Sequence, residues 1–230
     1  HLENKEAIDH RQEAIRELST DLEYRQQIRL LGLLYKGKPA DTTEIKEWAA
    51  SPSYYRKRTL LRILPIAVTV INFLCISLAI LGIISANIAG GVFVSIVLFS
   101  TIFSKGITKL QTTYGEKLQI LSTYADQILL TEQKEMHSHI LQELKTDLTS
   151  QNQTASQAVR QLSKLMNALD QRSNLLMSTI LNGLIFWELR QVMRIEKWKE
   201  IHASDLPRWI ETIGEIDAYC SLATFAYNHP

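Results

Sequence analysis

The sequence predicts an all-α protein: a core of long helices and a lever arm, an antiparallel helical hairpin, with an inserted apolar helical hairpin. Three observations predict this fold class. Apolar residues recur at spacings of three, four and seven over most of the 230 residues, which is the α-helical period. Only nine residues are Gly and five are Pro, too few for a turn-rich β-sandwich or barrel. No segment alternates apolar and polar residues between turn signals, as a strand would.

Residues 1–58 are the first predicted part of the helical core. An apolar stripe among many charges predicts a helix over residues 3–36. Gly37, with a proline just beyond it, is a helix stop signal. Asp41, followed three residues later by a glutamate, predicts a capping box for a short helix that runs through Trp48.

Residues 59–105 are predicted to form the apolar hairpin. The 42 residues of Ile63–Ser104 include no Asp, Glu, Lys or Arg. As one helix they would be roughly 63 Å long, about twice the ~30 Å hydrocarbon thickness of a bilayer. We therefore expect the chain to fold back near residues 85–87, which leaves arms over 63–84 and 88–104.

Two environments can accommodate this hairpin. A membrane suits it because neither arm has the charged face of a soluble helix. The flanking basic residues are Arg56, Lys57, Arg58, Arg62, Lys105 and Lys109, and the loop between the arms is uncharged. By the positive-inside rule both termini of the chain then face the cytoplasm. The alternative is a cytoplasmic protein in which the hairpin is buried in a soluble helical bundle.

Residues 106–186 are predicted to form the lever and residues 187–230 the C-terminal core. One apolar stripe predicts a long helix from about 107 to 148, and a second stripe continues from Val159 to Leu184. The polar stretch between them, 149–156, is the expected turn of an antiparallel arm. The last helix is predicted to start at Ser204-Asp205 with Pro207, and its stripe includes Trp209, Ile213, Leu222 and Phe225.

The sequence predicts no catalytic, cofactor-binding or metal site in this chain. Residues 32–38 match the G-x-x-x-x-G-K part of a phosphate-binding loop, but a helix precedes them and Pro39 replaces the required Ser or Thr. Cys75 and Cys220 are too few for a thiolate metal site, and we expect both to be buried small hydrophobes. The net charge of +1 excludes a strongly basic nucleic-acid arm, and the arm over 136–173 is itself nearly neutral.

The C-terminal segment nevertheless resembles a known family, the MutS family of DNA mismatch-repair ATPases. The family's E-x-D-A-x-x-S-L-A-like helix, which closes the helical core just before the ATPase domain, is matched here by Glu215, Asp217, Ala218, Ser221, Leu222 and Ala223. At the other end, Arg11, Glu17 and Leu18 belong to a stretch that looks like the R-x-x-A-I-x-E-L entry into the same core. The two anchors cover roughly 50 of the 230 residues.

The resemblance implies the helical core and lever of a MutS-like protein, without the ATPase domain and without the mismatch-reading Phe-x-Glu domain. The charge-free hairpin resembles a divergent bacterial subgroup with membrane-spanning helices ahead of the ATPase. By resemblance, the full-length protein would be an ATPase that uses ATP and Mg²⁺, would form a homodimer, and would have DNA as a partner. Its location would be the bacterial inner membrane.

The activity expected of this chain by itself differs from that expected of the full-length protein. The chain begins with His1, so we expect it to be part of a longer protein and to have no ATPase activity of its own. The alternative function, from a different class, is a membrane-anchored helical scaffold or signalling coiled coil without any ATPase. In that case the apolar stripe over residues 107–184 would be an oligomer seam.

Overall fold

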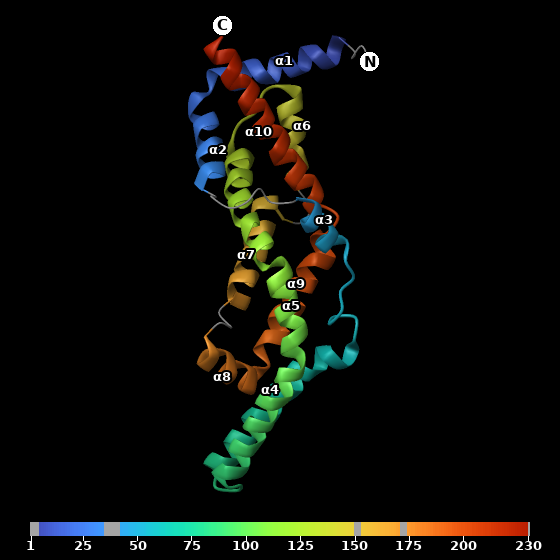
Figure 1. Ribbon diagram of the computed structural model, residues 1–230, viewed down its shortest axis with the longest axis vertical. Coiled ribbons are helices and arrows are strands. Elements are labelled where there is room, and N and C mark those ends of the chain that lie inside the picture. The colour runs from blue at the N-terminus through green and yellow to red at the C-terminus, as the bar shows by residue number, and fades with distance from the viewer. Residues whose placement is uncertain (1–4, 35–41, 150–152, 171–173, 230) are drawn as a thin grey trace. The chain divides into compact units, whose positions relative to one another are not determined.

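A computed structural model describes residues 5–34, 42–149, 153–170 and 174–229, and the all-α class is confirmed: these residues form helices and no strand. The helices of the first half are α1 (Lys5–Thr20), α2 (Leu22–Leu34), α3 (Thr42–Ala50), α4 (Thr59–Ile80) and α5 (Ala86–Gln133). Those of the second half are α6 (His139–Asp147), α7 (Ala155–Asp170), α8 (Leu175–Ile185), α9 (Trp187–His202) and α10 (Leu206–Asn228). Figure 1 labels them along the chain.

The helices form two compact units, each assembled from separate stretches of the chain. The first unit consists of residues 1–49, 119–163 and 202–230, and the second of residues 50–118 and 164–201. The predicted four-part division, 1–58, 59–105, 106–186 and 187–230, stays a prediction. The boundary expected at 105–106 falls inside α5, which continues without a break to Gln133.

In the first unit, α1 packs across α10, and α6 packs on both of them. The side chains that hold this unit together are almost completely buried; they include Ala14, Leu18, Ile28, Ile128, Leu141, Trp209 and Ile213. These residues recur at helical spacing, so each helix turns one apolar face inward, as the sequence predicts. Burial of such side chains is the main favourable term in folding.

The helix predicted over 3–36 is interrupted at Asp21, which separates α1 from α2. The Tyr24 backbone N–H donates to the Asp21 carboxylate at 3.0 Å, so Asp21 caps the start of α2. The helix predicted over 107–148 is also interrupted, between Gln133 and His139. The expected stop at Gly37–Pro39, the expected cap Asp41 and residues 150–152 of the polar turn lie outside the described residues.

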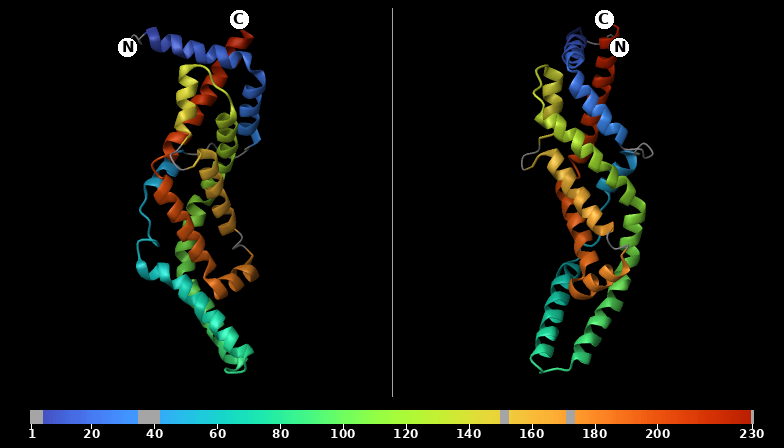
Figure 2. Two further views of the ribbon diagram at one scale, coloured as in Figure 1. Left: turned by 180° about the vertical axis from the view of Figure 1, so that it is seen from behind. Right: turned by 90° about the vertical axis from the view of Figure 1, so that its left-hand side faces the viewer.

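In the second unit, α4 and the first half of α5 run antiparallel, which Figure 2 shows in two views. The reversal occurs at residues 81–85, earlier than the expected 85–87, because Gly82 adopts a φ of 72°. This left-handed conformation lets the Ile83 N–H donate to the Leu78 carbonyl at 3.0 Å, which closes the end of α4. The Gly90–Gly91 pair then lies inside α5.

Candidate functional site

The surface of the apolar hairpin is the clearest functional feature among the described residues. Thr59–Ile80 and Ala86–Phe103 are both long and apolar enough, by length and composition, to cross a membrane. Only 17% of the apolar window in α4 and 6% of that in α5 is buried. The large side chains that remain exposed include Ile63, Ile66, Val70, Ile71, Phe73, Leu74, Ile80, Ile88, Val94, Leu98 and Ile102. A hairpin buried in a core built by the described residues would have the opposite pattern.

Asn72 attaches this hairpin to α8. Its side chain is only 2% exposed. The Nδ2 atom donates to the carbonyls of Gly183 at 2.7 Å and Leu184 at 3.3 Å, and to Val68 within α4 at 3.1 Å. A buried amide left without partners would cost free energy, so these acceptors hold α8 against the middle of α4.

Gly183 lies between the two arms of the hairpin. A Cβ atom built on it would come within 2.3 Å of Phe93 Cε2 and 2.7 Å of Val97 Cγ2, both in α5. The lack of a side chain therefore permits α8 to approach α5 on one side while its carbonyl accepts from Asn72 of α4 on the other. No sequence motif indicates this role, because it depends on a neighbour about 90 residues away in the chain.

Charged side chains complete the attachment of the hairpin. The Arg190 guanidinium donates to the Pro65 carbonyl at 2.9 Å and to the Thr69 hydroxyl at 2.7 Å, both in α4. The Glu196 carboxylate is 5% exposed and accepts three backbone N–H groups just before α4, those of Tyr54, Tyr55 and Arg56, at 2.7–3.0 Å. The charge-assisted bonds of Glu196 satisfy backbone N–H groups that have no partner within a helix.

The two segments that carry the family resemblance come together in the first unit, where α1 packs on α10. Leu18 and Ala223 are buried in this contact region, at 1% and 0% exposure. The other motif residues of α10 are all exposed; they are Glu215, Asp217, Ala218, Ser221 and Leu222. Leu222 and Phe225, which belong to the apolar stripe that marks this helix in the sequence, lie in α10 and are 51% and 65% exposed.

Glu17 has a structural role that its place in α1 does not reveal. Its carboxylate accepts the backbone N–H groups of His137 at 2.9 Å and Ser138 at 2.7 Å, immediately before α6. Burial raises the pKa of Glu17, but these hydrogen bonds and the nearby His137 outweigh it, and the net pKa lies below its usual value. Glu17 thus stabilises the interruption between α5 and α6 from 120 residues away.

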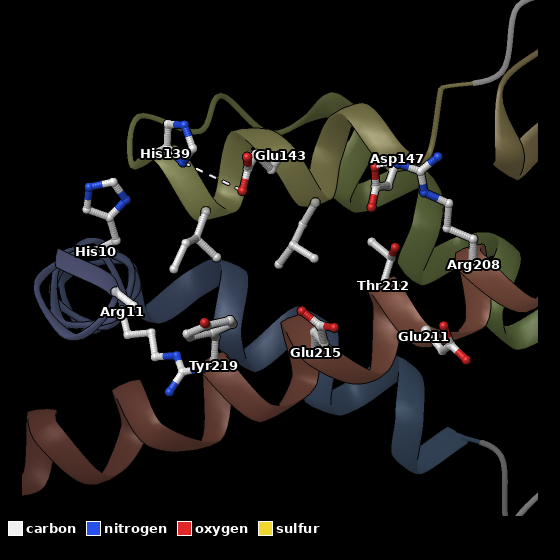
Figure 3. A pocket seen from close by; sticks show the side chains of 13 residues that line it. His10, Arg11, His139, Glu143, Asp147, Arg208, Glu211, Thr212, Glu215 and Tyr219 are labelled. Atoms are coloured by element: carbon white, nitrogen blue, oxygen red, sulfur yellow. Dashed lines mark hydrogen bonds and ion pairs between the residues drawn. The ribbon is translucent and has the colours of Figure 1, made fainter. Parts of the chain in front are cut away.

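A pocket of about 480 Å³ lies between α1, α6 and α10, and Figure 3 shows the side chains around it. Arg11 of α1 and Glu215 of α10, both named by the family resemblance, line it together with Tyr219. The rings of His10 and His139 are 5.1 Å apart between centroids. Two arginines and two histidines line the pocket together with the carboxylates of Glu143, Asp147, Glu211 and Glu215. This mixed charge favours no single class of ligand.

Reactive and metal-binding groups are not assembled in the described part of the chain. No cluster of three or more His, Cys, Asp or Glu side chains there can hold a metal ion. Cys220 is 5% exposed, as expected, whereas Cys75 is only partly buried. Burial and the nearby Asp217 raise the pKa of the Cys220 thiol to about 12, so it stays protonated and weakly nucleophilic at neutral pH.

Comparison with known proteins identifies no relative, since no protein-family model, curated protein or solved structure matches this chain.

Proposed function

We propose that this chain is the membrane-anchored helical core and lever of a MutS-like ATPase. The observation that carries the proposal is the apolar hairpin, whose two arms have the length of membrane spans and expose their large side chains. Such a surface is unfavourable in water and favourable in hydrocarbon. Its uncharged turn and the basic residues before α4 support an orientation with both termini in the cytoplasm.

The arrangement of α1 and α10 supports the family part of the proposal. The two helices that contain the resembling stretches, α1 and α10, pack directly on each other. In the proposed mechanism, an ATPase that follows residue 230 shifts α10, and the helices packed on α10 carry the shift onward. This coupling requires two discrete arrangements of the core. ATP and Mg²⁺ would bind outside this chain, and DNA and a second protomer are the proposed partners of the full-length protein.

Membrane partitioning of the full-length protein tests the anchor. We expect the protein to stay in the membrane fraction after carbonate extraction, because that treatment releases peripheral proteins but leaves spanning helices embedded. A variant in which a short Gly/Ser linker replaces residues 63–104 should move to the soluble fraction with its remaining helices folded, as judged by circular dichroism. A soluble full-length protein that loses its helical structure on the same deletion would instead make the hairpin part of a soluble core.

The reading frame beyond Pro230 and the activity of this chain test the MutS-like assignment. A Walker A sequence within about one domain length, ~150 residues, is expected. A stop codon there, or a signalling module, would support the anchored scaffold without an ATPase. The purified 230-residue chain should not hydrolyse ATP above background. Turnover by this chain alone would contradict the assignment of the ATPase to another domain.

A further inference from the structure

The helix α8 has its polar side turned toward the protein and its apolar side turned outward. The Ser178 hydroxyl donates to the Glu188 carboxylate at 2.9 Å. The side-chain amide oxygen of Asn182 accepts the Glu188 backbone N–H at 2.9 Å. Asn182 and Glu188 are 6% and 5% exposed. Because these buried polar groups need each other as partners, they determine which face of α8 points inward.

The outward face of α8 consists largely of apolar side chains, with Thr179 among them. Leu176 is 78% exposed, Met177 50% and Ile180 49%. The segment from Asn174 to Trp187 contains no charged residue. A helix on the surface of a soluble protein has the reverse arrangement, with apolar side chains inside and polar ones outside. Hydrocarbon around the helix would account for the reversal.

The position of α8 within the second unit explains why hydrocarbon is the expected surrounding. Its C-terminal end is bonded to Asn72, which lies well inside the apolar α4 and not at its charged beginning. The same end approaches Phe93 of α5 through Gly183. The exposed apolar side chains of α8 and those of the hairpin, such as Val70 and Ile71, therefore belong to helices that pack directly on each other.

We infer that the face of α8 formed by Leu176, Met177 and Ile180 is a lipid-binding surface in contact with bilayer acyl chains. The inference rests on the proposed membrane anchor and adds to it a third membrane-embedded element. The apolar part of α8, Leu176–Ile185, is too short to span, since ten residues of helix rise only about 15 Å. The helix enters the membrane without crossing it. Its interior backbone groups are satisfied within the helix, Asn174 accepts the Met177 N–H in its first turn, and Asn72 donates to its last carbonyls.

Site-directed spin labelling tests this surface in the 230-residue chain. Single cysteines at Leu176 and Ile180, in a background with Cys75→Ala and Cys220→Ala, are labelled with a nitroxide. The protein is reconstituted into phosphatidylcholine and phosphatidylglycerol vesicles. Collisions with oxygen, which concentrates in hydrocarbon, are compared with those of a water-soluble nickel chelate. Lys197→Cys, at an exposed charged position of α9, is the aqueous reference, and Val70→Cys reports on the hairpin.

Lipid contact predicts that oxygen collides more often than the nickel chelate at Leu176 and Ile180, with the ratio shifted toward that of Val70 and away from that of Lys197. A water-like ratio at both α8 positions, with a lipid-like ratio at Val70, would overturn the inference and leave the anchor intact. Low collision rates with both reagents at α8 would mean that a second copy of the chain covers the face, which also overturns it. Water-like ratios at all three positions would remove the membrane anchor itself.

Discussion

Several helix ends and loops of this chain are held by hydrogen bonds from a single polar side chain that lies far away in the sequence. Glu17 accepts the backbone donors before α6, Glu196 accepts those before α4, and Asn72 holds the end of α8. Each group is buried or half-buried. Each forms a hydrogen bond with a backbone group at a helix end or in a loop, where the helix itself supplies no partner. Loss of one partner would leave the other without a hydrogen bond, which is why such positions are sensitive to substitution.

The carboxylates of Glu17 and Asp21 make the stability of the first unit depend on pH. Burial raises the pKa of Asp21, but the hydrogen bonds and charge of Lys134 and the Tyr24 N–H outweigh it, so its net pKa, like that of Glu17, is lowered. A lowered pKa gives stability that is present above the usual value and is lost as the pH falls through the folded value. We expect the two carboxylates to lower the urea midpoint below about pH 5. This adds to a decrease that begins below about pH 6.5, because burial lowers the pKa of His202 in the same unit.

The Glu17→Gln variant should be less stable at neutral pH and should show a weaker decrease below about pH 5, because it lacks one of the two carboxylates whose pKa is lowered. Glu13→Gln removes an exposed carboxylate from the same helix and is the matched control. Identical pH profiles for the wild type and Glu17→Gln would contradict the assigned role of Glu17.

Replacement of Gly183 by alanine should weaken the attachment of α8, although alanine normally stabilises a helix interior by about 0.5–1 kcal/mol. The new Cβ would overlap Phe93 and Val97 and force their side chains to move. Gly214 is the matched control, because a Cβ there meets nothing within 4 Å. Urea unfolding in mild detergent measures the change in unfolding free energy of each variant. Gly214→Ala should be neutral or stabilised, and Gly183→Ala should be destabilised. A stabilised Gly183→Ala would refute the close approach.

At the scale of elements, α10 packs along one face and exposes the other. Trp209, Ile213 and Ile216 are buried at 1–2% exposure. The Trp209 ring also lies 5.7 Å from the ring of His202. The exposed face includes most of the residues that resemble the MutS family motif. The buried face therefore stabilises the fold, and the exposed face is accessible to a binding partner.

Substitutions on the two faces of α10 should have very different costs. Trp209→Ala removes a fully buried ring and is expected to cost about 3–5 kcal/mol of unfolding free energy. Leu222→Ala alters a half-exposed side chain of the same helix and should change stability by no more than about 0.5 kcal/mol. Chemical unfolding followed by far-ultraviolet circular dichroism measures both. Similar losses for the two variants would contradict the burial pattern of α10.

At the scale of the whole molecule, the chain forms two compact units whose parts are not consecutive in sequence. The first unit combines three stretches and the second combines two, and α5 and α7 each contribute residues to both units. The apolar hairpin and α8 belong entirely to the second unit. The first unit has a conventional buried core, whereas the second exposes the long apolar surface.

This distribution predicts that the purified chain needs an amphiphile to remain dispersed. Exposed contiguous apolar patches beyond a few hundred Å² promote association in water, and the hairpin and α8 expose side chains along their whole length. Size-exclusion chromatography should show aggregation in plain buffer and a single species in a mild detergent. The chain with residues 63–104 replaced by a short linker is the matched comparison, and it should aggregate less. A monodisperse wild-type chain in plain buffer would argue against membrane insertion.

The sequence alone determined the features that depend on local periodicity and length. The 3.6-residue apolar pattern was sufficient to predict the all-α class. The charge-free run was sufficient to predict two helices of spanning length. Ser204-Asp205 with Pro207 was sufficient to predict the start of α10. Tertiary structure decided the interruptions at Asp21 and residues 134–138, the turn at Gly82 and the inverted orientation of α8. Except at Asp21 and Gly82, these features depend on partners distant in the chain, such as Glu17 for His137 and Asn72 for Gly183. A local pattern cannot encode a partner that only folding brings close.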